Sequence, residues 1–302
     1  MSHGEDGEKR VAISGASGLV GSALGEHLRR QGWSVEPLVR DREDDGIYWS
    51  VAEQALDVEG LEGVDAVVHL AGKNINDGRW SDEHKRQILE SRVRGTELLA
   101  GAVAELSDPP ESFVCASAVG YYGPRGDEWV DETNESGEGF LPKVCRRWEA
   151  ASKRAGEVCR VANTRFGMVL TAEGGALAEM LTPFKFGVGG RIGDGEQYMS
   201  WIAETDVVRA IEFVIDGELE GPVNVVSPEP VKNKVFTKAL GRALGRPTFL
   251  PVPTPALKLL AGAELAEALL LSGQRVRPAK LLDAGFEFEY PDIDQALEAA
   301  LG

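Results

Sequence analysis

Residues 11–24, VAISGASGLVGSAL, constrain the fold more than any other part of this chain. An apolar run rich in β-branched residues stops at Gly15, and two more glycines follow at three-residue spacing, Gly18 and Gly21. Apolar residues then recur at helical spacing through residues 19–31. This order predicts a strand, a tight turn and a helix, which is how a βαβ unit begins.

The three glycines have separate physical roles in such a turn. Gly15 permits the tight turn, Gly18 lets a phosphate approach the backbone, and Gly21 lets the helix pack closely against the sheet. The N–H groups of the turn and the helix dipole then face a pyrophosphate, so the segment predicts a dinucleotide site. The alternative is a plain glycine-rich turn. The residues expected to contact the dinucleotide are Gly15, Ser17, Gly18, Leu19, Val20 and Gly21.

Strands and helices alternate through the first half of the chain. Strands are expected at residues 10–14, 34–39, 47–49, 66–70, 112–116 and 160–166. Helices are expected at residues 19–31, 81–106 and 143–156. Short apolar strands that alternate with helices predict an α/β fold, a Rossmann-type doubly wound parallel sheet with helices on both faces.

The second half is less regular. GVGGRIGDGEQ, residues 187–197, predicts a long loop. Further helices are expected at residues 204–215 and 234–244, in a segment that opens at the proline-rich FLPVPTPALKLL and reaches about residue 272, and after residue 292. Further strands are expected at residues 223–226 and 285–288. We expect residues 8–170 to form the dinucleotide-binding domain, with 203–226 returning to it. Residues 171–302, including the C-terminal segment 249–302, would form a smaller, mostly helical substrate region.

Length and composition bound the class of protein. The 302 residues suit one large α/β domain or one domain with a small cap, and 43% hydrophobic content can fill a core. No apolar run is long enough to cross a bilayer, and the polar start MSHGEDGEKR lacks the parts of a signal peptide. We therefore expect a cytoplasmic protein with no membrane partner. Cys115, Cys145 and Cys159 form no CxxC pair, so we expect free thiols and no metal site.

The chain is strongly acidic. Its 49 Asp and Glu residues against 32 Lys and Arg residues give a net charge of −17. Such a surface repels phosphates, which disfavours nucleic acid as a partner. The acidic residues are scattered, as in GEDGE, DREDD and DGELEG, rather than gathered in one tail. This distribution suits concentrated salt, where counterions screen the repulsion, and predicts a halophilic origin; the alternative is an ordinary acidic cytosolic enzyme.

Charged residues after the second strand indicate which dinucleotide is bound. An Asp or Glu at this place usually contacts the ribose hydroxyls of NAD, whereas an Arg accommodates the 2′-phosphate of NADP. Arg40 is the first charged residue after the apolar run 34–39, and its guanidinium suits bidentate contact with phosphate. NADP(H) is therefore favoured; Asp41 keeps NAD(H) possible, and Arg40 as a plain surface residue is the alternative.

The strand at 66–70 ends in small residues. Leu70, Ala71 and Gly72 would let a cofactor lie across the carboxyl end of this strand, near the topological switch point. His69 continues the buried run AVV, which favours a satisfied core histidine over a catalytic one.

These segments together resemble the extended short-chain dehydrogenase/reductase superfamily, through GASGLVG, HLAG, VRGTELL and SAVGYYG. The longer segments NINDGRWSDEHKRQILESRVRGT, GVGGRIGDGEQYMSWI and LLLSGQRVRPAKLLDAGFEFEYP are similar to an atypical, epimerase-like subgroup of NAD-dependent epimerase/dehydratase proteins, called YfcH-like. The resemblance covers nearly the whole chain. It implies a Rossmann-type fold, nicotinamide dinucleotide binding, an oxidoreductase or epimerase activity, and a small C-terminal domain, but no particular substrate. A homodimer through the helices at 81–106 and 143–156 would follow the habit of the family.

The chain departs from the superfamily at its catalytic pair. The usual chemistry needs a Tyr as general acid/base and a Lys four residues later on the same helix. With Glu149 aligned to the usual glutamate of that helix, Leu141 falls at the Tyr position and Cys145 at the Lys position. Neither side chain performs the usual proton transfer, although a Cys145 thiolate would be reactive if Arg146 or Arg147 lowered its pKa; a packed thiol is the alternative.

Other residues of the same region are candidates to replace the pair. Ser117 is the preferred superfamily serine, since the other alignment places Ala118 there, and Tyr121 and Tyr122 are the nearest acids. One of the tyrosines is expected to face the cleft while the other packs; both packing is the alternative. Arg92 would point at the cofactor or at an acidic substrate, and Phe166 would line the nicotinamide end.

These observations predict an NADP(H)-binding oxidoreductase or epimerase that acts on a small hydroxyl or carbonyl substrate. The missing Tyr–Lys pair leaves a second hypothesis open, a dinucleotide sensor or scaffold without catalysis. A nucleotide-sugar epimerase with the ordinary mechanism is weakened by Leu141 and Cys145.

Overall fold

The computed structural model describes residues 8–302, without the side chains of residues 260 and 261. The N-terminal stretch MSHGEDGEKR, on which the expectation of no signal peptide rests, lies mostly outside the described residues. Within the described part, no helix has both the length and the apolar character needed to cross a membrane.

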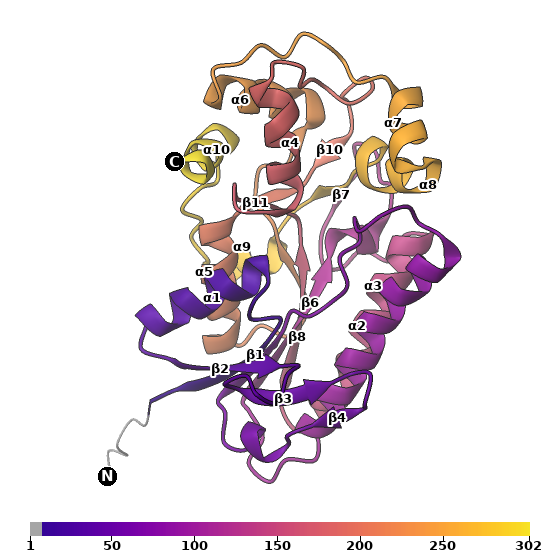
Figure 1. The fold of residues 1–302 in the computed structure, drawn as a ribbon. Helices are drawn as coiled ribbons and strands as arrows, with labels where there is room; N and C mark the ends of the chain where they lie inside the picture. Colours follow the sequence, from indigo (N-terminus) through magenta and orange to yellow (C-terminus); the bar gives the residue numbers. More distant parts are fainter. Residues whose placement is uncertain (1–7) are drawn as a thin grey trace.

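One central sheet of eight strands organises the molecule (Figure 1). Its order is β12-β8-β6-β5-β1-β2-β3-β4. The strands are β1 (Arg10–Ser14), β2 (Ser34–Val39), β3 (Ile47–Ser50), β4 (Ala55–Leu56), β5 (Ala66–His69), β6 (Ser112–Ala118), β8 (Arg160–Phe166) and β12 (Gly221–Val225). All neighbours are parallel except β3 and β4. The chain order reverses between β1 and β5, which makes this the switch point where ligands bind in such sheets.

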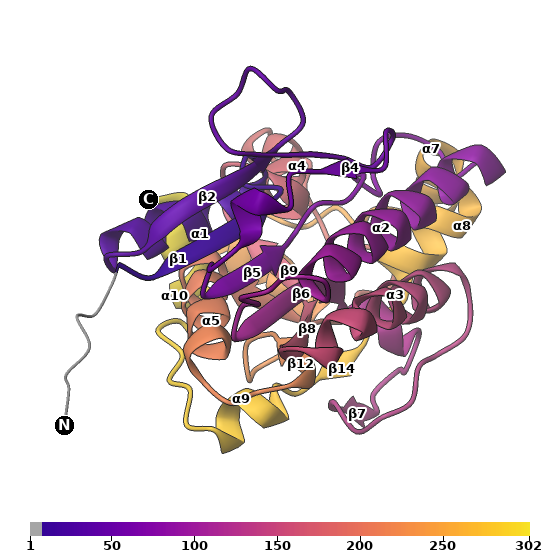
Figure 2. The same ribbon diagram turned by 90° about the horizontal axis from the view of Figure 1, so that it is seen from below.

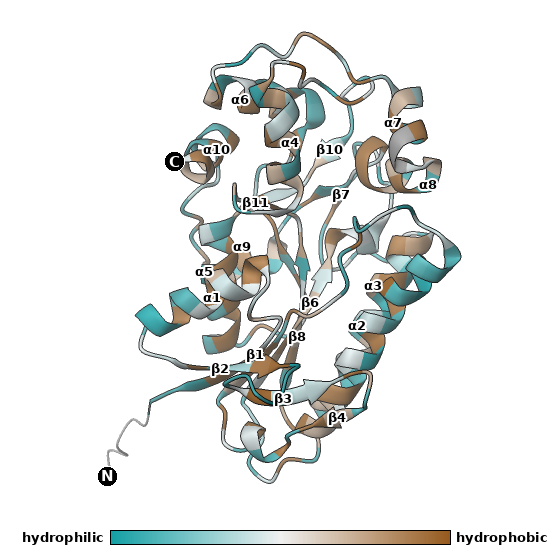
Figure 3. Cartoon of the chain, in the orientation of Figure 1, coloured by the Kyte–Doolittle hydropathy of each residue, from teal (hydrophilic) through white to brown (hydrophobic). Residues whose placement is uncertain are grey.

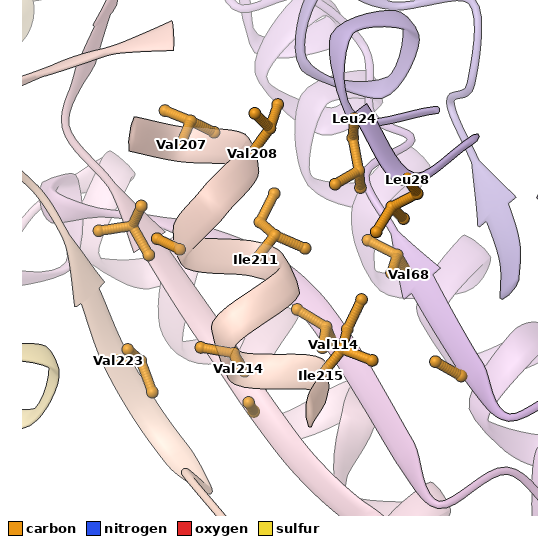
Figure 4. Packing of buried hydrophobic residues seen from close by; sticks show 14 of the residues in the cluster. Leu24, Leu28, Val68, Val114, Val207, Val208, Ile211, Val214, Ile215 and Val223 are labelled. Carbon is orange, nitrogen blue, oxygen red and sulfur yellow. The ribbon is translucent and has the colours of Figure 1, made fainter. Parts of the chain in front are cut away.

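Helices cover both faces of the sheet (Figure 2). On one face, α1 (Leu19–Arg30) and α5 (Glu204–Asp216) bury Leu24, Leu28 and Ile211 against the strands (Figure 4). On the other face, α2 (Asp82–Val103) and α3 (Phe140–Ala151) bury apolar residues such as Leu99 and Trp148. The expected α/β fold with a Rossmann-like, doubly wound sheet is confirmed.

A second, mainly helical region lies beyond the carboxyl ends of the strands (Figure 1). Its apolar core joins α4 (Gly175–Lys185), α6 (Asn233–Ala243) and α10 (Ile293–Leu301). The region also contains α7 (Thr254–Ala261), α8 (Ala263–Ala266) and the π-helical turn η4 (Glu267–Leu271), whereas α9 (Ala279–Asp283) packs with Leu281 into the core of the central fold. Three strand pairs accompany them, β7 (Trp129–Val130) with β14 (Arg275–Val276), β9 (Met168–Leu170) with β11 (Trp201–Ala203), and β10 (Tyr198–Met199) with β13 (Val231–Lys232).

Residues 203–226 contribute α5 and β12 to the central fold, since β12 pairs with β8. This arrangement is consistent with the expected return of the segment to the dinucleotide-binding domain. The exact domain boundaries stay a prediction.

The strand predicted at residues 285–288 is wrong. Phe286 and Phe288 pack edge to face against each other, 4.8 Å between ring centroids, in the apolar cluster that contains Phe213. The backbone N–H groups of the following Glu289 and Tyr290 are bound by the Asp206 carboxylate at 2.8 and 2.9 Å. The alternation of FEFEY thus comes from side-chain packing and a carboxylate anchor rather than from pairing with another strand.

Candidate functional site

One position in the turn between β1 and α1 and one in the first turn of α1 accept only glycine. Gly15 has φ +72°, and a Cβ there would lie 3.0 Å from the backbone nitrogen of Ala71. A Cβ on Gly21 would lie 2.1 Å from the carbonyl oxygen of Gly15. The N–H of Gly18 donates to the same carbonyl at 2.9 Å, which closes the turn. Strand, turn and helix are therefore as close as the three-glycine pattern predicts.

The first turn of α1 is open to an anion. No side chain caps the helix at Gly18, and its first turn carries no acidic residue. Ser17 and Gly18 are exposed, whereas Leu19 and Val20 are half-buried. Uncapped N–H groups at the positive end of a helix dipole favour a phosphate. The donor set of this turn therefore fits a pyrophosphate.

The end of β5 lies directly against the glycine turn. Ser14 Oγ contacts Nδ1 of His69 at 2.5 Å and accepts from the N–H groups of Leu70 and Ala71 at 3.2 and 3.3 Å. His69 is fully buried, and burial lowers its pKa to about 3. His69 is therefore a neutral core histidine, but it is satisfied only in part: Nδ1 bonds Ser14, whereas the buried Nε2 has no hydrogen-bond partner among the described residues.

Arg92 projects from α2 toward the same strand end. Its Nη1 donates to the backbone carbonyls of Lys73 and Ile88 at 2.8 and 3.2 Å, and its guanidinium lies 4.9 Å above the ring of Trp148. A Cβ on the exposed Gly72 would be 3.2 Å from the guanidinium carbon. Burial lowers the pKa of Arg92 to about 10, so the side chain stays charged at neutral pH. Within residues 8–302 no carboxylate pairs with it.

Arg40 is the uncommitted cation after β2. It is exposed, and in the described part of the chain no acidic side chain pairs with it. Arg42, by contrast, lies 3.7 Å above the ring of Tyr48 and pairs with Glu53 at 3.6 Å. Asp41 accepts the N–H of Glu43 at 3.1 Å and so stabilises its own loop. Among the described side chains of this loop, Arg40 has no such contact, and its role at a phosphate stays a prediction.

A buried polar network lies at the carboxyl ends of β6 and β8. Ser117 Oγ donates to Oε1 of Glu149 at 2.7 Å. Arg165 donates to both carboxylate oxygens of Glu149, through Nε at 2.8 Å and Nη2 at 2.9 Å. Burial opposes the charge of Arg165, but the contacts with Glu149 outweigh it and raise the pKa. Ser117 is 2% exposed, and its hydroxyl is oriented by the hydrogen bond to Glu149.

The two candidate tyrosines differ in burial and in their contacts with this network. Tyr122 is fully buried; its hydroxyl accepts from Arg165 Nη1 at 2.9 Å and donates to Asn224 Oδ1 at 2.7 Å. Burial raises the pKa of Tyr122 to about 12. Tyr122 is therefore the packed member of the pair and cannot exchange a proton with a substrate. Tyr121 is half-buried, with its ring 3.4 Å from the guanidinium carbon of Arg165, and a role as acid stays a prediction for it.

The positions of the missing pair carry no acid or base. Leu141 packs over η2 (Val119–Tyr122), where a Cβ on Gly120 would lie 3.4 Å from the Leu141 Cβ. Cys145 is buried, its Sγ donates to the carbonyl of Ala118 at 3.7 Å, and burial raises its pKa to about 11. Cys145 is a packed thiol, not a thiolate. Phe166 ends β8 half-buried and packs against the apolar clusters on both faces of the sheet.

Sequence reasoning missed the roles of Glu149 and Asn224. The side chain of Glu149 joins Ser117 to Arg165, and that of Asn224 binds Tyr122. A signal existed for part of this network, because Arg165 and Asn224 are polar residues within the predicted strands at 160–166 and 223–226, and both are buried. A polar residue in a buried strand needs a partner, but the sequence does not name that partner.

Two family models match the chain. Residues 11–226 match the NAD dependent epimerase/dehydratase family, and residues 252–300 match a domain of unknown function, DUF1731. The first match contains the glycine turn and the Ser117 network, and the second begins just before α7.

Relatives match over almost the full length. The epimerase family protein ML0860 of Mycobacterium leprae is 44% identical over 96% of this chain and 95% of its own length. The epimerase family protein YfhF of Bacillus subtilis is 35% identical over 95% of this chain and 96% of its own. The crystal structure of human epimerase family protein SDR39U1 with NADPH has a TM-score of 0.90 and 33% identity, covering 97% of this chain and 99% of that one.

Proposed function

Because the chain belongs to the NAD dependent epimerase/dehydratase family, we propose that it binds NADP(H) and is an oxidoreductase or epimerase of the extended short-chain dehydrogenase type. Its substrate would be a small hydroxyl or carbonyl compound. The observation that carries the proposal is convergence: the glycine turn, Arg92 and Ser117 meet at the carboxyl ends of β1, β5 and β6.

The cofactor would lie across the switch point of the sheet. Gly15, Gly18 and the first turn of α1 would bind the pyrophosphate, because their N–H groups are uncapped and carry no nearby acid. Arg40 would contact the 2′-phosphate, which favours NADP(H) over NAD(H). The SDR39U1 structure with NADPH supports this choice. Arg92, a charged group without a carboxylate partner, would contact the part of the cofactor that lies over Gly72.

Ser117 and Tyr121 would act on the substrate oxygen. A bound nicotinamide gives a hydride to a carbonyl carbon or takes one from the corresponding alcohol. The Glu149 carboxylate fixes the Ser117 hydroxyl in one orientation, and the guanidinium of Arg165 lies 3.4 Å from the Tyr121 ring and so positions that side chain. Because Ser117 donates its own proton to Glu149, its oxygen would accept a hydrogen bond from a substrate hydroxyl, and Tyr121 would supply or remove the proton of the substrate oxygen.

A sensor or scaffold function is the second candidate. It is favoured by Leu141 and by the protonated, buried thiol of Cys145, which leave the positions of the usual pair without proton chemistry. The Ser117→Ala variant separates the two functions. An enzyme would keep NADPH binding and lose turnover with a carbonyl substrate, whereas a sensor shows no turnover before or after the change.

Calorimetric titration with NADPH and NADH in molar KCl tests cofactor binding directly. Tight binding of NADPH with weak binding of NADH is the expected result. Equal affinity for both would contradict the assignment of Arg40 to the 2′-phosphate, and binding of neither would overturn the proposed function.

A further inference from the structure

The place of the missing lysine on α3 carries no charge. Cys145 stands there, 4% exposed, and burial raises the pKa of its thiol to about 11. Figure 3 shows hydrophilic and hydrophobic residues mixed along this helix. Its basic side chains, Lys143, Arg146 and Arg147, are all exposed, and Arg146 donates to the carbonyl of Gly137 at 2.8 Å. Among the described side chains, α3 therefore places no positive charge at the site.

The neighbouring helix places one there instead. α2 and α3 lie side by side (Figures 1 and 2). The guanidinium carbon of Arg92 on α2 is 4.9 Å from the centre of the Trp148 ring, one turn after Cys145 on α3. Burial raises the pKa of the Cys145 thiol, and the charge of Arg92 opposes that rise. Cys145 Sγ donates to the carbonyl of Ala118, the residue after Ser117, at 3.7 Å. Arg92 is thus a neighbour of the position that lacks the lysine.

The same guanidinium lies over the end of β5. A Cβ on the exposed Gly72 would be 3.2 Å from its central carbon, so the missing side chain leaves the room that Arg92 occupies. Gly72 follows Ala71, whose backbone nitrogen would be 3.0 Å from a Cβ on Gly15. In the sheet, β5 lies between β1 and β6. Arg92 is therefore placed between the glycine turn on one side and the Ser117 end of β6 on the other.

Part of the donor set of Arg92 is available to a ligand. Nη1 donates to the carbonyls of Lys73 and Ile88 at 2.8 and 3.2 Å, whereas Nε and Nη2 bind no group in the described part of the chain. The carbonyls and the ring of Trp148 hold the side chain in place without neutralising it. Its pKa, lowered by burial to about 10, keeps it charged at neutral pH. A fixed cation with unused N–H groups can bind hydroxyl or phosphate oxygens.

We propose that Arg92 supplies from α2 the positive charge that the lysine supplies from α3 in the superfamily, and that it binds the hydroxyls of the ribose next to the nicotinamide. This inference rests on the proposed binding of NADP(H). With the pyrophosphate at the glycine turn and the nicotinamide beside Ser117, the ribose that joins them would pass the guanidinium. The site would then keep its cation although α3 has lost it.

Calorimetric titration with two ligands tests this assignment. NADPH contains the ribose next to the nicotinamide, whereas 2′-phosphoadenosine 5′-diphosphate has the same 2′-phosphate and two linked phosphates but ends before that ribose. Arg92→Met keeps a long side chain beside Trp148 and loses the charge. It should bind NADPH about tenfold more weakly and the shorter ligand as the wild type does. Arg92→Lys, which returns a positive charge, should recover most of the affinity for NADPH.

Two further variants make the comparison independent of any one substitution. Arg92→Gln keeps an N–H donor for the neighbouring carbonyls, and it too should weaken NADPH alone. Arg94→Met is the matched control and should bind both ligands normally, since Arg94 lies on the same helix, is exposed and pairs with Glu90 at 3.5 Å.

Each other outcome has its own meaning. Equal loss of both ligands in the Met and Gln variants, or unchanged NADPH binding in both, would overturn the assignment of Arg92 to the ribose. A Lys variant as weak as the Met variant would contradict the exchange of one cation for another. Absence of NADPH binding by the wild type would instead overturn the proposed function, so the two failures are distinguishable.

Discussion

Oε1 of Glu149 accepts hydrogen bonds from both Ser117 Oγ, at 2.7 Å, and Arg165 Nε, at 2.8 Å. One carboxylate therefore neutralises a buried guanidinium and orients the serine at the candidate site. The side chains of Arg165 and Glu149 are only 3% and 14% exposed, so water contributes little to either. The pair is therefore expected to matter both for the stability of the fold and for the orientation of Ser117.

The Glu149→Gln variant should lose much of this stabilisation. An amide retains the shape but leaves the buried charge of Arg165 uncompensated, which costs about 3–5 kcal/mol. Urea unfolding measures the change. Glu90→Gln is the control, because Glu90 pairs with Arg86 and Arg94 at the surface, at 3.4 and 3.5 Å, and should change the free energy of unfolding little. A similar effect of both variants would contradict the central role of Glu149.

The Arg40→Ala variant should change cofactor selectivity. Loss of a charge-assisted contact with the 2′-phosphate is expected to weaken NADPH by about 1–3 kcal/mol while leaving NADH nearly unchanged. Arg42→Ala is the matched control, since Arg42 is occupied by Tyr48 and Glu53. Calorimetric titration of both variants with both dinucleotides is the measurement. Equal loss of NADPH and NADH in Arg40→Ala would refute the assigned role.

Local patterns predicted the sheet and the strand, turn and helix at residues 10–30 for a physical reason, while the contacts of this turn with a cofactor stay a prediction. Gly18 and Gly21 each lie against the carbonyl of Gly15, a few residues away, so the spacing encodes their close approach, whereas Gly15 also lies against Ala71 of the neighbouring strand end. The strand at 285–288 was predicted wrongly because the alternation of Phe286 and Phe288 also suits packing without strand pairing.

The polar network was beyond sequence reasoning because its members are distant in the chain. Ser117 and Glu149 are 32 residues apart, and Tyr122 and Asn224 are 102 apart. Which polar residues meet depends on the order of β6, β8 and β12 in the sheet, and no local pattern states that order. For the same reason, the sequence did not show which of the adjacent residues Tyr121 and Tyr122 is packed in the core. The structure shows that Tyr122 is fully buried and that Tyr121 is half-buried.

The buried His69 should make stability sensitive to mild acid. Its pKa of about 3 in the folded protein lies below the usual 6.5, so between these values the unfolded chain binds a proton that the folded chain does not. The free energy of unfolding should then fall as pH drops below 6.5, by about 1.4 kcal/mol per pH unit from this residue. The contribution is fully present above pH 6.5 and is exhausted near pH 3.

The His69→Gln variant tests this linkage, because glutamine still bonds Ser14 but does not titrate. Between pH 7 and pH 5, the wild type should lose about 2 kcal/mol more of its free energy of unfolding than the variant loses. Urea unfolding at the two pH values gives both differences. Parallel losses would show that His69 is not the group responsible.

The excess negative charge predicts that salt stabilises the fold. With a net charge of −17, repulsion between exposed carboxylates opposes the compact state, and at 1 M salt the screening length falls to about 3 Å. The melting temperature should therefore rise from low to molar KCl. Glu43, Asp44 and Asp45 are exposed in one loop, so replacing them with Gln, Asn and Asn should reduce the slope of melting temperature against KCl. A melting temperature that does not depend on KCl would contradict a halophilic origin.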